Sequence, residues 1–209
     1  MGKLNVFMVA FVMMITGLTS SICCRRISAS ETEDFNLIEY IETTGIESGE
    51  DVYRAIKMYT GEDICTNDDR NNSNANIQST VTIDYDNEEV IIATIITEQV
   101  MLTGKAQSRK LNAKYEVLSS AGKLLYTIEA SGKFTYNGNS CSVSNAAGYF
   151  SPANTDAWTS TPTTSTGTTS DSAYVKVSGT AKKTVHSKKY TFKLMCDADG
   201  NASTSFSNA

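Results

Sequence analysis

The chain is poor in the residues that most often carry enzyme chemistry. It has one histidine, His186, and one tryptophan, Trp158, among 209 residues. A Ser-His-Asp or Cys-His site needs a histidine held by an oriented partner, whereas His186 lies in a lysine-rich stretch typical of an exposed turn. No GxGxxG, GxxxxGK[ST], HExxH or CxxC pattern is present. We therefore assign no catalytic residue, no metal ligand and no cofactor.

Proline is also scarce, with Pro152 and Pro162 alone, while Ser, Thr, Asn and Gly are plentiful. This balance suits strands joined by turns better than helices. Hydrophobic residues make up 40% of the chain and come in organised runs, which excludes disorder in bulk. The length is sufficient for one domain with its own core and a small appendage.

The longest hydrophobic run lies at the N-terminus, and its length is close to that of a membrane-spanning segment. Lys3 precedes Val6–Leu18, which is almost wholly apolar. Such a run is typical of a signal peptide and is short of a bilayer span. We predict a signal peptide over residues 1–29 and a secreted mature chain, with small residues at 19–21 and 27–29 as two candidate cleavage sites.

An uncleaved membrane anchor is the alternative for the same segment. If Val6–Cys24 is taken whole, Arg25 and Arg26 follow it as a stop-transfer flank would. The protein would then be held on the outer cell surface. The membrane is a partner only in this alternative.

The charges are segregated along the chain. Residues 31–69 are strongly acidic, whereas residues 105–196 carry an excess of lysine and arginine. Opposite charges in the two halves should attract one another. The acidic segment either packs beside the β domain or shields a basic face that binds a polyanion. The candidate residues for such binding are Lys182, Lys183, Lys188 and Lys189.

The first part of the mature chain, residues 30–76, is predicted to be an acidic segment that contains one short amphipathic helix. Residues 31–47 are expected to be extended or irregular. Ser48 is a plausible N-cap for a helix over about 49–60, and Gly61 fits its C-terminal end. An asparagine-rich linker then leads to a β domain over residues 77–209.

Alternating apolar residues, with a period of two, dominate the β domain. Val90–Ile96 is β-branched on both faces, as a covered central strand would be, and Asn137-Gly138 is a strong turn signal. Tyr174–Gly179 and Tyr190–Cys196 are predicted strands, and the Ser/Thr-rich stretch before them is an edge strand or a surface loop. We predict a mainly β fold, an antiparallel β-sandwich of Ig-like or Greek-key type.

Two groups of acidic residues are candidate sites. Four carboxylates, Asp84, Asp86, Glu88 and Glu89, crowd a predicted turn, and glycoside hydrolysis needs paired carboxylates. Asp197-Ala-Asp199-Gly-Asn201 begins like a calcium loop, but the sixth and twelfth positions hold Ala202 and Asn208. A hairpin turn is the better account of residues 197–201, and a small hydrolase stays the alternative function for the carboxylates.

Export permits disulfide bonds. Cys141 and Cys196 both lie in strand-like surroundings, so we predict that they pair, which leaves Cys65 free or intermolecular.

A resemblance covers Tyr115 to about Ser203. The residues that carry it are Tyr115-Glu-Val-Leu118, Gly122-Lys-Leu-Leu-Tyr126, Gly132-Lys-Phe-Thr-Tyr-Asn-Gly138 with Cys141, Trp158, and Leu194-Met-Cys196-Asp-Ala-Asp-Gly200-Asn-Ala-Ser203. This stretch resembles an uncharacterised domain family of small secreted proteins from Gram-positive bacteria. The resemblance implies an extracellular β-rich domain and supports the pairing of Cys141 with Cys196.

The expected function is therefore that of a secreted, non-catalytic extracellular module. Its basic hairpin is expected to contact anionic cell-wall polymers or host-surface glycans. Nucleic acid is not an expected partner, because one basic hairpin gives little evidence for it and the chain is exported.

Overall fold

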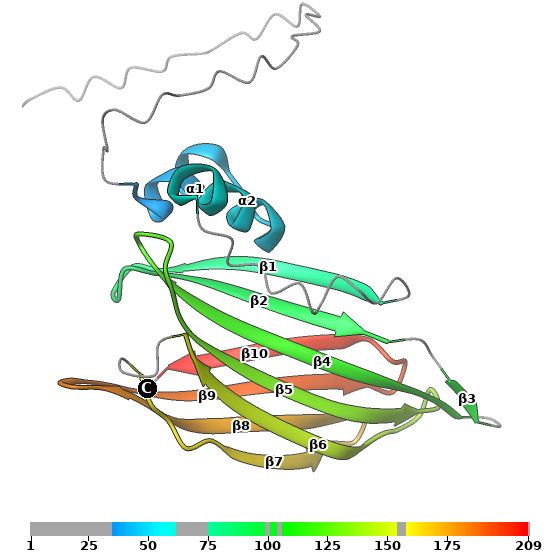
Figure 1. Ribbon diagram of the computed structural model, residues 1–209. Coiled ribbons are helices and arrows are strands. Elements are labelled where there is room, and N and C mark those ends of the chain that lie inside the picture. The colour runs from blue at the N-terminus through cyan, green and yellow to red at the C-terminus, as the bar shows by residue number, and fades with distance from the viewer. Residues whose placement is uncertain (1–34, 62–74, 99–100, 104–105, 154–157, 209) are drawn as a thin grey trace, which may run out of the picture. The chain divides into compact units, whose positions relative to one another are not determined.

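The structure is a computed structural model that describes residues 35–61, 75–98, 101–103, 106–153 and 158–208 (Figure 1). The predicted signal peptide, its anchor alternative and Cys65 lie outside these residues. The helices are α1 (Leu37–Thr44) and α2 (Gly49–Thr60). The strands are β1 (Asn76–Asp84), β2 (Glu89–Thr97), β3 (Met101–Thr103), β4 (Ala106–Ser119), β5 (Leu124–Tyr136), β6 (Cys141–Pro152), β7 (Thr163–Thr168), β8 (Ser172–Lys183), β9 (His186–Asp197) and β10 (Ala202–Asn208). Neither α1 nor α2 has the length and apolarity to cross a membrane.

The strands form two antiparallel sheets. Sheet A has the order β1-β2-β4-β5-β6, with β3 paired to β4, and sheet B has the order β10-β9-β8-β7. The predicted mainly β, antiparallel class is confirmed. Along each sheet the strands keep their order in the sequence, with β3 off this path beside β4, so neither sheet by itself has the 4-1-2-3 order of a Greek key, one of the two types that the sequence predicts. Short turns link most strands, and such turns favour a meander over a crossover.

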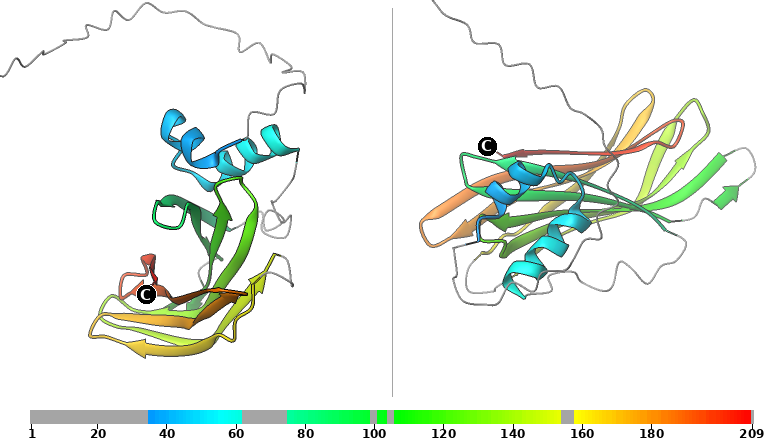
Figure 2. Two further views of the ribbon diagram at one scale, coloured as in Figure 1. Left: turned by 90° about the vertical axis from the view of Figure 1, so that its left-hand side faces the viewer. Right: turned by 90° about the horizontal axis from the view of Figure 1, so that it is seen from above.

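The main core lies between the two sheets, which face each other (Figures 1 and 2). The period-two alternation of each strand supplies its apolar side chains. The fully buried members include Leu111, Ile128, Phe134, Val175, Val177, Phe192 and Leu194. Burying this apolar surface is the main favourable contribution to the fold.

A second core lies between the helices and sheet A. Leu37 and Ile41 of α1, and Val52 and Ile56 of α2, pack against one face of β1 and β2. Because the other face of β2 contacts the main core, β2 is covered on both sides, as its β-branched sequence predicts. The helices and both sheets belong to one compact unit.

The sequence predicted α2 well and missed α1. Ser48 caps α2 by accepting the N–H of Asp51, and Gly61 ends the helix in the left-handed conformation with φ +74°. The expectation of an extended segment over residues 31–47 is wrong for α1, where Asn36 accepts the N–H groups of Ile38 and Glu39. Eight residues give too few turns for a clear 3.6-residue period.

Turn and edge predictions in the β domain are confirmed. Asn137-Gly138 lies in the turn between β5 and β6, where Gly138 has φ +84°. The Ser/Thr-rich stretch contains β7, which is the edge strand of sheet B. The sequence did not predict β10, a strand of mostly serine and threonine that completes a hairpin with β9.

Candidate functional site

Lysine and hydroxyl side chains line the face of sheet B that points away from sheet A. Val175 of β8 and Phe192 of β9 are fully buried in the main core, so strand alternation places Lys176 and Lys193 on the opposite face. No described helix or strand covers that face (Figure 2). We define the outer face of sheet B as Thr163, Ser165, Ser172, Tyr174, Lys176, Ser178, Thr180, Lys182, Ser187, Lys189, Thr191, Lys193, Met195, Asp197, Ser203, Ser205 and Ser207.

Two lysines at the centre of this face lie directly opposite each other. Lys176 pairs with Lys193 in the antiparallel register, and the same row continues to Ser165 on β7 and Ser205 on β10. Like charges in opposed positions destabilise a sheet. Within the described residues no carboxylate forms an ion pair with either lysine. An anion between the two ammonium groups would relieve their repulsion. We call these residues the central lysine pair.

A second pair of lysines lies nearer the β8–β9 hairpin. Lys182 is opposite Ser187 and Lys189 is opposite Thr180, so the two lysines are diagonal neighbours on the same face. Both are exposed. Lys189 precedes Lys193 by four positions along β9, a separation of about 13 Å in an extended strand. We call Lys182 and Lys189 the end lysine pair.

The structure thus separates the four lysines predicted to bind a polyanion. Lys182 and Lys189 share the outer face, and Lys183 is exposed at the hairpin end opposite His186. Lys188 points the other way, toward the main core, because it alternates with Lys189 along β9. Its Nζ donates to Oε1 of Glu89 at 2.7 Å. Lys188 is therefore engaged within the protein.

Sequence reasoning singled out neither Lys176 nor Tyr174 for the site. The sequence does contain a signal for this face, because Tyr174, Lys176 and Ser178 alternate with apolar residues along β8. Placing Lys176 opposite Lys193 also needs the exact hairpin register, which depends on a turn at Thr184 and Val185. That turn has none of the glycine or asparagine residues that mark a hairpin.

Comparison with family models, curated proteins and solved structures found no match to this chain. The resemblance to a secreted Gram-positive family therefore stays a prediction.

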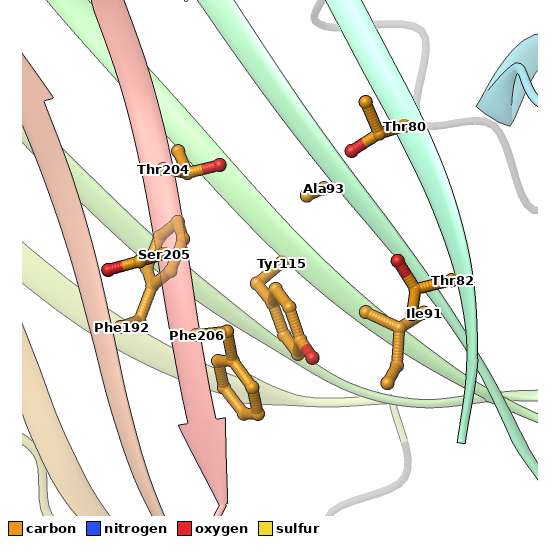
Figure 3. Close-up of a pocket in the computed structure, with 9 residues that line it drawn as sticks. All are labelled: Thr80, Thr82, Ile91, Ala93, Tyr115, Phe192, Thr204, Ser205 and Phe206. Carbon is orange, nitrogen blue, oxygen red and sulfur yellow. The ribbon is translucent and has the colours of Figure 1, made fainter. Parts of the chain in front are cut away.

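A pocket of about 230 Å³ opens between the two sheets beside β10 (Figure 3). The rings of Tyr115 and Phe206 stack in its wall, with centroids 3.6 Å apart and planes 12° from parallel. Burial raises the pKa of the Tyr115 phenol. The remaining lining residues are neutral: Thr80, Thr82, Ile91, Ala93, Phe192, Thr204 and Ser205. The Tyr115 phenol is the one titratable group among these lining residues.

The two cysteines predicted to pair come together between the sheets. Cys141 begins β6 of sheet A and Cys196 lies near the end of β9 of sheet B. Their thiols donate to the backbone carbonyls of Ser142 and Asp197, respectively, and both are free, so the predicted disulfide is not formed in this structure. Burial raises the pKa of both thiols, that of Cys196 to about 12. Neither is activated as a nucleophile.

The four clustered carboxylates lie at the turn between β1 and β2. Asp84 accepts hydrogen bonds from the backbone and side-chain N–H groups of Asn87, as a turn residue does. Glu89 is 5% exposed and lies opposite Asp84 in the register. Burial raises the pKa of the Glu89 carboxyl, although its hydrogen bond and ion pair with Lys188 lower it. The cluster therefore contains one perturbed acid, already bonded to a lysine.

The remaining candidates are structural. The Asp197 carboxylate accepts the backbone N–H groups of Asp199 and Asn201 and the Asn201 amide, so the predicted hairpin turn is confirmed. These bonds lower the pKa of Asp197 in spite of the opposing effect of desolvation. His186 is exposed at the first position of β9.

Proposed function

We propose that this chain is a secreted, non-catalytic extracellular module that binds anionic polymers of the cell wall or the host surface on the outer face of sheet B. One observation carries the proposal. The outer face contains the central and end lysine pairs, and the one carboxylate among its residues, Asp197 at the last position of β9, accepts hydrogen bonds from its own turn. A surface on which positive charge predominates attracts anionic ligands and raises their rate of association.

Export and the two-layer architecture are part of the same proposal. The N-terminal apolar run supports secretion, and two facing antiparallel sheets support the β-sandwich class. The resemblance to secreted domains of Gram-positive bacteria favours wall polymers as partners. The chain needs no cofactor for this function, since binding rests on lysine and hydroxyl side chains.

The test is retention on an immobilised anionic polymer, sulfated dextran, with neutral dextran as the reference. We expect retention at low salt, loss of retention as salt screens the lysines, and no retention on neutral dextran. The variant K176Q/K193Q should bind at least about fivefold more weakly, because the contacts of two half-buried charges with the polymer are lost.

A matched control is present on the other sheet. Lys110 and Lys133 are also directly opposed, but they lie on sheet A, where Lys110 forms an ion pair with Glu98 at 3.1 Å. The variant K110Q/K133Q removes the same charge and should bind nearly as the unmodified protein does. Equal losses in the two double variants would mean that net charge, not the outer face of sheet B, governs binding. Retention that is absent, or unchanged in high salt, would also refute the proposal.

A hydrolase is the second candidate, favoured by the buried Glu89 carboxyl opposite Asp84. A raised pKa beside a second carboxylate is what an acid-base pair requires. Turnover of wall or glycan polymers that is abolished in E89Q or D84N would replace the binding proposal. Turnover that survives both changes would exclude these residues as the catalytic pair.

A further inference from the structure

Hydroxyl groups fill the part of the outer face that lies between the two lysine pairs. Ser178 of β8 and Thr191 of β9 are opposed, with their hydroxyl oxygens 3.4 Å apart. The same row continues to Thr163 on β7 and Ser207 on β10. Each hydroxyl can both donate and accept a hydrogen bond. A ligand that reaches from one lysine pair to the other must therefore cross a strip suited to neutral polar groups.

An aromatic ring lies across the edge of this face, next to the central lysine pair. A Cβ on Gly167 of β7 would lie 2.3 Å from the hydroxyl oxygen of Tyr174 and 2.4 Å from its Cζ, so the ring covers the position of the missing side chain. Tyr174 therefore extends over the neighbouring strand instead of standing upright. Lys193 Nζ lies over this ring, 5.3 Å from its centroid, in a cation–π contact, so a sugar ring that packs on Tyr174 takes the place of an ammonium group that can then pair with an acidic group of the ligand.

From this arrangement we infer that the ligand is a linear anionic polysaccharide that runs along β8 and β9. The inference rests on the proposed function and names the class of polymer. Acidic groups of the polymer contact the central and end lysine pairs, its hydroxyl groups bond to the rows between them, and a sugar ring packs on Tyr174. A polyphosphate can pair with the lysines and accept hydrogen bonds from the serine and threonine hydroxyls, but it has no apolar ring face to pack on Tyr174.

Length should matter for such a ligand. The two lysine pairs are about 13 Å apart along β9. An oligomer that reaches both pairs gains the second contact as an intramolecular step, whereas a shorter one binds one pair at a time. Affinity for a series of acidic oligosaccharides should therefore rise steeply at the length that spans both pairs.

The experiment compares a carboxylated polysaccharide with inorganic polyphosphate of matched chain length, using Y174A, Y174L and the control Y149A. Tyr149 is 58% exposed on the outer face of sheet A. We expect Y174A and Y174L to weaken polysaccharide binding about three- to tenfold and to leave polyphosphate binding unchanged. Y149A should change neither. Leucine still covers Gly167 without an aromatic ring, so Y174L keeps the test valid if Y174A folds poorly.

The outcomes separate this inference from the proposed function. Equal effects of the Tyr174 changes on both polymers, or none on either, would overturn the polysaccharide inference and leave a polyanion site of purely electrostatic character. Binding that does not depend on oligomer length would overturn the extended path along β8 and β9. If the unmodified protein binds neither polymer at low salt, the proposed function itself fails.

Discussion

Lys188 of β9 and Glu89 of β2 form an ion pair that joins the two sheets, with Nζ 2.7 Å from Oε1. Their side chains are 18% and 7% exposed. Removing one member of a buried pair leaves the other charge without compensation. We expect K188M to lower the free energy of unfolding by roughly 3 kcal/mol, measured by urea denaturation.

Replacing Glu89 by glutamine should lower the free energy of unfolding much less than K188M does. In E89Q the amide oxygen still accepts from Lys188 while the buried negative charge is gone. The double variant E89Q/K188M should recover most of the stability lost in K188M, because no buried carboxylate then remains unpaired. If the losses in the two single variants simply add, the two residues do not interact.

The pH dependence of stability follows from the same carboxyl group. Burial raises the pKa of Glu89 above its ordinary value of 4.5 in spite of Lys188, so the folded state holds this proton more tightly than the unfolded chain does. The contribution of the protonated Glu89 carboxyl to stability is fully present below the unfolded-state pKa. It is lost as pH rises through the folded-state pKa. We expect the unmodified protein to lose stability relative to E89Q as pH rises above the ordinary carboxyl pKa of 4.5. A difference that grows in the opposite direction would show that Lys188 outweighs burial.

Oxidation should link the two sheets through Cys141 and Cys196. The two thiols interact with each other in the core, and a disulfide between them would close a loop long enough to stabilise the fold by about 4 kcal/mol in the chain-entropy account. We expect exported protein to gain two additional alkyl groups when it is reduced before alkylation, as intact mass would show. The variant C141S/C196S should gain none.

In the reduced protein the same thiols should react slowly. The raised pKa of Cys196, about 12, keeps it protonated near neutral pH, and both cysteines are buried. Alkylation of the reduced, folded protein should therefore be far slower at these two sites than in urea. Fast modification in the folded state would contradict the burial of the pair.

Local signals in the sequence account for much of this fold. Ser48 and Gly61 mark both ends of α2, and the apolar alternation around Val175 and Phe192 marks two strands. Such features depend on neighbours a few residues apart. α1 was missed because its stability comes from Leu37 and Ile41 packing on sheet A, a tertiary contact that short-range pattern cannot reveal.

The candidate site depends on register and on the choice of face. Lys188 and Lys189 are adjacent in the sequence, yet one bonds to Glu89 in the interior and the other lies on the outer face. Lys176 and Lys193 come together only through the pairing of β8 with β9. A one-residue shift of register would exchange the faces, so a list of lysines in sequence cannot define the site.

Helix α1 should unfold together with the sheets. Leu37 is fully buried, and its N–H donates to the carbonyl of Ser120 at 2.6 Å, so the helix is fixed to the turn between β4 and β5. L37A should lower the free energy of unfolding by about 3 kcal/mol, whereas T43A, on the exposed side of α1, should change it little. Because α1 shares its core with β2, helical and sheet signals should be lost in one transition. An earlier, separate loss of the helical signal in L37A would mean that the helices fold independently of the sheets.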